Sequence, residues 1–191
     1  MPEKKKLFSV YNLVVIAIFV ALIAVCTWIT IPAGAVPFTL QTFAVFVTGG
    51  ILGVRRGTIA VIVYILIGII GVPVFSGFTS GIVKFIPNTE TGMTGGYIIG
   101  FIFTTIIIGI FRHISIDKES KVKMIYIGIG MVLGDIVCLA FGTVWFWLFN
   151  PMHLGLIATL SACVVPFIIP EIAKIIVALL VVTRVNKYKY I

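Results

Sequence analysis

The sequence predicts an all-α membrane protein, a single bundle of six transmembrane helices, from three observations. Of the 191 residues, 61% are hydrophobic and only 10% are charged, whereas a soluble domain carries about a quarter charged residues. The mean hydropathy is +1.25, so lipid must be the solvent for most of the chain. The charges gather just beyond long apolar runs, which indicates membrane topology and not a nucleic-acid surface, despite the net charge of +8.

Apolar length and turn residues divide the chain into six spans within one domain, residues 1–191. The predicted spans are approximately residues 7–31, 38–54, 57–74, 94–111, 124–149 and 170–186. The outer loops between them are residues 32–37, 75–93 and 150–169.

The first three spans are bounded by proline and by arginine. The first apolar run is too long for the core of a signal peptide, so it is interpreted as a span that ends before Pro32. The second span ends at the pair Arg55 and Arg56. The third span begins at Gly57 and ends near Pro73.

The last three spans follow a loop rich in Gly, Ser, Thr and Asn. The fourth and fifth spans are separated by the charged linker 112–123. The apolar run 154–180 is too long for one simple span and is interrupted by Pro166 and Pro170. Because proline is tolerated in the first helical turn but not in a helix interior, the sixth span is predicted to begin at Pro170.

The cations give the orientation, because cytoplasmic loops carry an excess of Lys and Arg. If the N-terminus lies inside, all of the 14 Lys and Arg residues except Lys84 and Lys174 are on the cytoplasmic side. The inner residues are Lys4, Lys5, Lys6, Arg55, Arg56, Arg112, Lys118, Lys121, Lys123, Arg184, Lys187 and Lys189. The sequence therefore predicts a multi-pass protein of the cell membrane with both termini in the cytoplasm.

Three ionisable residues lie inside predicted spans: Asp135, Glu171 and Lys174. A charge at the bilayer centre costs about 2.5–3.5 kcal/mol on insertion scales, so such a residue faces a partner or a cavity. Glu171 and Lys174 share one helix face at i, i+3, where they either neutralise each other or line a site for a small carboxylate. For Asp135, lining the same cavity and pairing with another helix both remain open.

Motifs of enzyme chemistry are absent from the sequence. There is no Gly-rich phosphate loop that ends in Lys-Ser/Thr. His113 and His153 are remote from each other, and Cys26, Cys138 and Cys163 lie far apart in apolar segments. We expect no catalytic residues and no metal site, and we expect the cysteines to be buried small hydrophobes.

Five segments resemble signatures of one family, in the right order along nearly the whole chain. They are residues 36–42 (VPFTLQT), 49–53 (GGILG), 71–77 (GVPVFSG), 94–101 (TGGYIIGF) and 170–174 (PEIAK). They resemble the BioY family, the biotin-specific substrate-binding subunits (S-components) of energy-coupling factor (ECF) transporters.

The resemblance implies a fold of the S-component type, with a site for biotin near the outer face that is capped by the first and third loops. It implies a high-affinity subunit that captures biotin outside and needs no cofactor, biotin being the transported ligand. It also implies a transmembrane coupling subunit and two ATPase subunits as partners, which explains the missing phosphate loop. Ala17 and Ala21 match the Ala-x-x-x-Ala pattern that packs on the coupling subunit in such proteins.

For biotin, our hypothesis assigns Lys174 to the ligand carboxylate. Gln41, Thr79 and Glu171 are expected to make polar contacts that orient the ligand. Tyr97 and Trp145 are expected to form walls of the site. The roles of Lys174 and Glu171 are interchangeable at this stage. The expected site residues are Gln41, Thr79, Tyr97, Trp145, Glu171 and Lys174.

Three positions depart from the family pattern, all in the expected site. Glu171 stands where the family usually has Asp, Thr79 where relatives place Asn, and Ile98 where some have Arg. An S-component for another small vitamin-like ligand is therefore one alternative. A stand-alone carrier or channel that needs no ATPase is the other.

Overall fold

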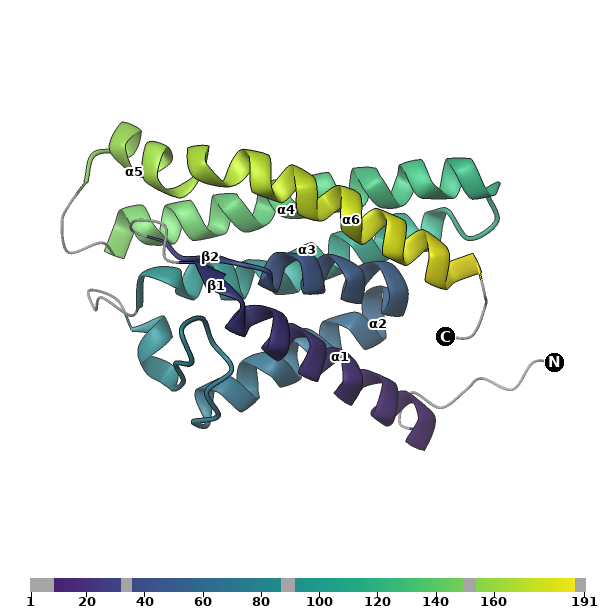
Figure 1. Cartoon of the computed structure of the whole chain (residues 1–191), viewed down its shortest axis with the longest axis horizontal. Coiled ribbons are helices and arrows are strands. Elements are labelled where there is room, and N and C mark those ends of the chain that lie inside the picture. Colours follow the sequence, from purple (N-terminus) through teal and green to yellow (C-terminus); the bar gives the residue numbers. More distant parts are fainter. Residues whose placement is uncertain (1–8, 32–35, 87–91, 150–153, 188–191) are drawn as a thin grey trace.

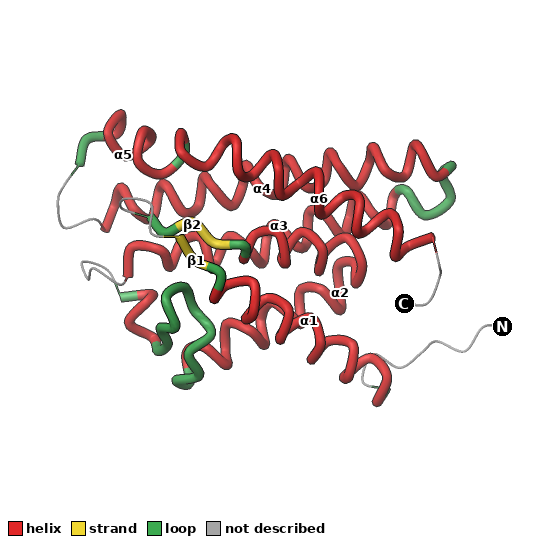
Figure 2. Tube along the Cα trace, in the orientation of Figure 1, coloured by secondary structure: helices red, strands yellow, loops and turns green. Residues whose placement is uncertain are grey.

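The computed structural model describes residues 9–31, 36–86, 92–149 and 154–187. It is a bundle of long helices with one short two-stranded sheet at one end (Figures 1 and 2). The elements are α1 (Val10–Trp28), β1 (Thr30–Ile31), β2 (Phe38–Thr39), α2 (Gln41–Ile69), the 3₁₀ turns η1 (Ile82–Phe85) and η2 (Gly92–Thr94), α3 (Gly95–Ile114), α4 (Ser120–Phe149), α5 (Leu156–Cys163), η3 (Val165–Phe167) and α6 (Ile168–Lys187).

Five helical stretches within the described residues are long and apolar enough to cross a membrane. They are α1, α2, α3, α4 and the stretch Leu156–Lys187 that ends with α6. The all-helical membrane class is thus confirmed, whereas the count differs from the six predicted spans. The reason is that α2 covers two of the predicted spans in one element.

Helix α2 folds back on itself at Gly53. This residue has φ 73° and ψ −170°, a conformation outside the helical region that only glycine adopts easily. The side-chain Nε2 of Gln41 donates a hydrogen bond of 2.7 Å to the hydroxyl of Tyr64, 23 positions later. In a straight helix these residues would lie about 34 Å apart, so the two arms of α2, residues 41–52 and 54–69, run antiparallel (Figure 1). The chain turns two residues before the predicted boundary at Arg55.

One end of the bundle holds the start of α1, the turn at Gly53, the α3–α4 connection and the end of α6 (Figure 1). Among the described residues, every Lys and Arg except Lys84 and Lys174 lies at or near this end. The basic clusters at the two chain ends, residues 4–6 and 189, lie outside the described residues. The charge asymmetry that the sequence predicted is therefore a property of the fold in its described part.

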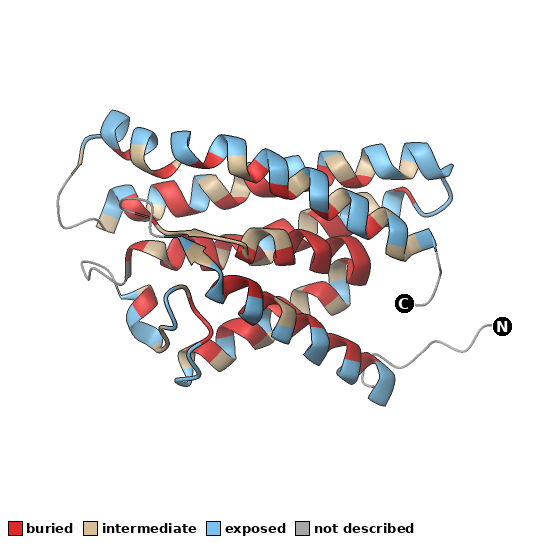
Figure 3. Cartoon of the chain, in the orientation of Figure 1, coloured by how far each residue is buried: buried red, intermediate tan, exposed pale blue. Residues whose placement is uncertain are grey.

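Helix α3 lies between α2 and α4 and packs closely against both (Figures 1 and 3). A Cβ atom added to Gly100 of α3 would stand 3.0 Å from the Cα of Cys138 on α4, closer than most real Cβ contacts, so glycine favours this approach of the two helices. Outward-facing side chains are large and apolar, such as Ile18, Ile129 and Ile169, which are 59%, 44% and 80% exposed. Such a surface suits lipid.

The opposite end of the bundle carries the loops that the sequence predicts to lie outside the cell. Strands β1 and β2 pair in antiparallel fashion, with Thr30 opposite Thr39, and they flank the predicted loop 32–37, of which residues 32–35 lie outside the described part. The predicted loop 75–93 is anchored by Phe75, which is 1% exposed. The predicted loop 150–169 contains α5 and η3, so it is largely helical where it is described. Residues 87–91 and 150–153 lie outside the described part.

Candidate functional site

A buried ion pair joins the first two turns of α6. The Nζ atom of Lys174 lies 2.7 Å from Oε1 of Glu171, and both side chains are almost fully buried. Thr42, near the start of α2, closes the cluster: its hydroxyl accepts a hydrogen bond of 2.9 Å from Lys174 and donates one of 3.1 Å to Glu171. The Lys174 ammonium also lies 4.2 Å from the centre of the Phe38 ring, within the range of a cation–π interaction.

Two carboxyl oxygens beside this cluster have no hydrogen-bond partner among the described residues. They are Oε2 of Glu171 and Oδ1 of Asp135, on α4. Glu171 and Asp135 are 4% and 7% exposed. Because buried polar groups are nearly always hydrogen-bonded, these oxygens mark a place where a ligand or water completes the structure.

These groups line a cavity of about 570 Å³, counted with its opening to solvent. Its apolar lining residues are Val36, Pro37, Ile98, Phe101, Leu139 and Phe167. Its other lining residues are Thr39, Gln41, Thr42, Ser76, Thr94, Tyr97, Asp135, Cys138, Glu171 and Lys174.

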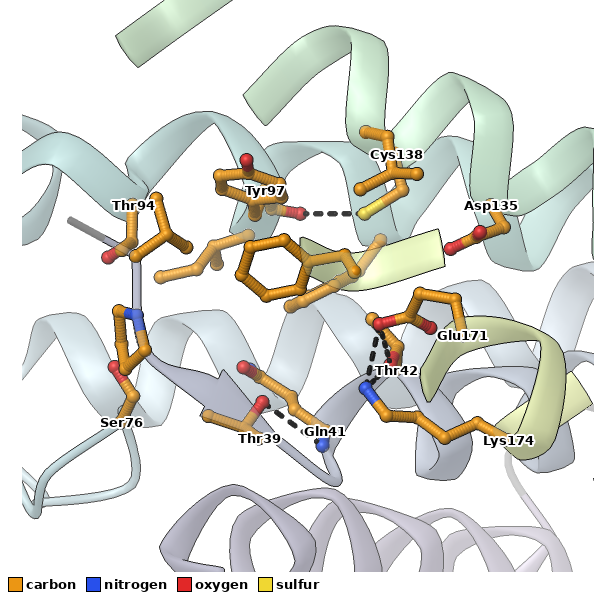
Figure 4. A pocket seen from close by; sticks show the side chains of 16 residues that line it. Thr39, Gln41, Thr42, Ser76, Thr94, Tyr97, Asp135, Cys138, Glu171 and Lys174 are labelled. Carbon is orange, nitrogen blue, oxygen red and sulfur yellow. Dashed lines mark hydrogen bonds and ion pairs between the residues drawn. The ribbon is translucent and has the colours of Figure 1, made fainter. Parts of the chain in front are cut away.

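Polar groups occupy both ends of the cavity (Figure 4). Asp135, Glu171 and Lys174 gather at one end, whereas Ser76 and Thr94 lie at the other. Mostly apolar and aromatic side chains lie between the two groups, together with Thr39 and Gln41. The cavity therefore suits an elongated ligand with an apolar middle and a polar group at each end.

Gln41 is held in the cavity wall by a chain of hydrogen bonds. Its amide donates to the Tyr64 hydroxyl, which in turn donates to the carbonyl of Val74 at 2.8 Å. The Thr27 hydroxyl of α1 lies 3.4 Å from the same Tyr64 oxygen. These hydrogen bonds connect both arms of α2 to α1 and to the segment at Val74. The position of Gln41 therefore depends on the packing of these elements.

Tyr97, in the first turn of α3, lines the cavity with its ring. Its hydroxyl donates a hydrogen bond of 3.1 Å to the carbonyl of Cys163. The ring packs so closely on Gly142 of α4 that a side chain there would overlap it. Since the hydroxyl is engaged by the protein, Tyr97 offers the cavity an aromatic surface, in line with the wall role predicted from the sequence.

The other two predicted site residues lie outside the cavity wall. The hydroxyl of Thr79 donates to the carbonyl of Ser76 at 2.9 Å, and it is Ser76 that lines the cavity. Trp145 packs against Gly95 and Gly96 of α3, behind the wall. Thr79 thus supports a lining residue, and neither Thr79 nor Trp145 is among the residues that line the cavity.

Sequence reasoning did not assign Thr42, Ser76, Thr94 or Phe167 to the site. Thr42 follows Gln41 directly in the segment VPFTLQT, so the resemblance held a signal for it. Ser76 and Thr94 belong to two further signatures of the resemblance, GVPVFSG and TGGYIIGF. Phe167 has no such signal, because its place depends on how η3 turns over the cavity.

The small residues of α1 divide between two faces. Ala17 and Ala21 are exposed on the outer surface of the bundle, whereas Ala24, 7% exposed, is buried. The exposed pair is therefore available to lipid or to a partner helix.

Comparisons with known proteins agree with this architecture. Residues 1–190 match the sequence profile of the BioY family. A protein of Thermotoga maritima named "Biotin transporter BioY" is 37% identical over 92% of this chain and 96% of its own. The "Biotin transporter BioY2" of Lactococcus lactis is 36% identical over 88% of this chain and 86% of its own.

A solved structure, described as the S-component for biotin from an ECF-type ABC transporter, has a similar fold. It superposes with a TM-score of 0.79 at 29% sequence identity, covering 93% of this chain and 92% of that one. The match extends over the bundle that carries the cavity. The resemblance found in the sequence is thereby confirmed, and the chain belongs to the BioY family.

Proposed function

We propose that this chain is the membrane-embedded, high-affinity biotin-binding subunit of an ATP-driven ECF transporter. It captures biotin from the outer side and is not an enzyme, and biotin is its transported ligand and not a cofactor. The observation that carries the proposal is the cavity with a polar group at each end and an apolar middle. Family membership and the named relatives support the same ligand.

Biotin matches the cavity in its distribution of polarity. It consists of a cyclic urea, an apolar thioether ring and a valerate chain that ends in a carboxylate. At the end of the cavity with Asp135, Glu171 and Lys174, two carboxyl groups already face one ammonium. A third carboxylate is disfavoured there by like-charge repulsion in a medium of low dielectric constant.

This charge balance favours the urea at the charged end. Its carbonyl accepts from Lys174 and its N–H groups donate to carboxyl oxygens, while the valerate points toward Ser76 and Thr94. In this arrangement Lys174 binds the urea and not the ligand carboxylate, to which the sequence alone assigned it, while Glu171 keeps its role as a polar contact. Gln41 and Tyr97 supply the polar and aromatic walls between the two ends.

We further propose six membrane crossings with both termini in the cytoplasm of the cell. Each arm of α2 is one crossing, and the turn at Gly53 is the connection on the inner side. The gathering of described cations at the end that holds this turn supports that orientation. The cavity then opens toward the outer loops, where biotin arrives.

The partners in this proposal are a transmembrane coupling subunit and two ATPase subunits. The exposed alanines Ala17 and Ala21 of α1 let a partner helix approach closely. The lack of a phosphate-binding loop in the sequence agrees with ATP hydrolysis by other subunits.

Titration of the purified protein with biotin, thiamine and riboflavin tests the ligand. We expect saturable binding of biotin with a Kd in or below the nanomolar range, and no binding of the other two. Saturable binding of another vitamin in place of biotin would support the alternative S-component. Failure to co-purify with coexpressed coupling and ATPase subunits, together with uptake that needs no ATP, would support a stand-alone carrier.

A further inference from the structure

Asp135 is a buried carboxyl, one oxygen of which has no hydrogen-bond partner within the part of the chain that the structure describes. It lies on α4 in the wall of the cavity, 7% exposed, and its Oδ1 accepts no hydrogen bond from any described residue. Burial of a carboxyl oxygen without a hydrogen bond is costly. A donor that enters through the cavity would satisfy it.

Glu171 presents a second acceptor to the same space. Its Oε1 is engaged by Lys174 and Thr42, while its Oε2 has no partner among the described residues. The side chains of Asp135 and Glu171, from α4 and α6, lie at the same end of the cavity (Figure 4). Two acceptors from different helices thus converge on one region.

Lys174 is the only cation among the described residues that line the cavity. With both carboxyl groups ionised, this end carries one excess negative charge. Such a site attracts N–H donors and repels anions. A ligand group with two N–H donors side by side, as in a urea or a guanidine, meets both acceptors at once.

We propose that Asp135 is a specificity-determining residue that accepts a hydrogen bond from an N–H group of the ligand, alongside Glu171. It makes this end of the site select N–H-rich head groups, neutral or cationic, and exclude anionic ones. The inference rests on the proposed function, since the urea of biotin is the head group considered. A purely structural Asp135 predicts instead that its replacement weakens all ligands equally.

The test compares biotin with 2-iminobiotin, in which a guanidine that is cationic at neutral pH replaces the urea. Asp135→Asn keeps the shape and one acceptor oxygen but removes the charge. We expect the ratio of Kd for 2-iminobiotin to Kd for biotin to rise by about tenfold in this variant, as for the loss of one charge-assisted hydrogen bond. Asp117→Asn, the same change at an exposed position, should leave the ratio unchanged.

The outcomes separate this inference from the proposed function. An unchanged ratio in a folded Asp135→Asn variant overturns the role of Asp135, as does a wild-type protein that binds biotin but not 2-iminobiotin. A wild-type protein that binds no biotin overturns the proposed function instead. If Asp135→Asn does not fold, Asp135→Thr provides the same comparison with a smaller neutral acceptor.

Discussion

Lys174 and Glu171 meet where water is largely excluded, since their side chains are only 6% and 5% exposed. In such a place, the cost of removing each charge from water is offset only while both are present and hydrogen-bonded. Thr42 and the Phe38 ring complete the coordination of the ammonium. The pair therefore affects folding as well as the ligand binding proposed for it, and a useful variant must separate the two effects.

Lys174→Ala should destabilise the protein by about 3–5 kcal/mol, because it leaves a buried carboxylate unpaired. It should also weaken biotin binding at least tenfold, through the loss of a charged hydrogen-bond donor. Thermal unfolding in detergent and calorimetric titration measure the two effects. Lys187→Ala, at the exposed end of α6, is the control and should change neither.

The double variant Glu171→Gln/Lys174→Met removes both charges together. Most of the stability should return, because neither position of the pair then carries an unpaired charge, whereas the affinity for biotin should stay low. A double variant that binds biotin as tightly as the wild type would contradict the polar role of this pair.

Lys84 is a second buried lysine, in η1 of the outer loop region, and is 6% exposed. Burial lowers the pKa of its ammonium below the usual value of 10.5. The unfolded chain therefore keeps a proton that the folded chain releases, so stability should rise as the pH increases from the lowered pKa toward 10.5. Below the lowered pKa, the full cost of burying the charge remains.

Lys84→Met removes this cost and should raise the melting temperature near neutral pH. The difference between variant and wild type should shrink as the pH approaches about 10. Melting curves across this range check the prediction. A difference that does not change with pH would show that packing, and not the charge, is responsible.

At the scale of elements, the two arms of α2 matter most for the site. One arm carries Gln41 and Thr42 into the cavity, and the other carries Tyr64, which holds Gln41. Their antiparallel arrangement depends on Gly53, whose φ of 73° is easily reached only without a side chain. A Cβ atom there would also stand 3.1 Å from Nη1 of Arg112.

Gly53→Ala should therefore destabilise the protein by about 1–3 kcal/mol. Thermal unfolding measures the loss, and biotin affinity should fall less than in Lys174→Ala, since the site is distant. Gly155→Ala is the matched control, because that glycine has φ −61° and open space around its Cα. Equal effects of the two substitutions would contradict a special role for the turn.

At the scale of the whole molecule, the bundle turns large apolar side chains outward and keeps its charged groups in the interior and at its ends. Hydrogen bonds between buried polar side chains lie inside the bundle, around the cavity. The outer face of α1 differs in carrying the small residues Ala17 and Ala21. Lipid needs no small residues there, whereas a closely packed partner helix does.

Ala17→Leu/Ala21→Leu should disrupt assembly with the coupling subunit while leaving biotin binding unchanged, because both side chains are exposed on α1 and neither lines the cavity. Co-purification and biotin titration measure the two properties. Ala140→Leu, at an exposed position on α4, makes the same change elsewhere and should leave assembly intact. Loss of assembly in Ala140→Leu as well would indicate a general effect of bulk.

Much of the site could be predicted because the sequence marks it with unusual residues. Glu171 and Lys174 are charges within an apolar run, and Gln41 and Tyr97 belong to segments that resemble family signatures. Thr42 was missed because its role depends on a contact with a residue 132 positions away. Thr79 was placed in the site by register, but the loop turns its hydroxyl toward its own backbone.

The sequence by itself determined that the chain crosses a membrane, which end carries the cations and to which family it belongs. These properties depend on local apolar length, on charge and on segments that are contiguous in the chain. Only the tertiary structure decided that α2 doubles back at Gly53 and that Asp135 shares a cavity with Glu171. The physical reason is that both depend on how separate helices pack, and local sequence does not specify which faces of distant helices meet.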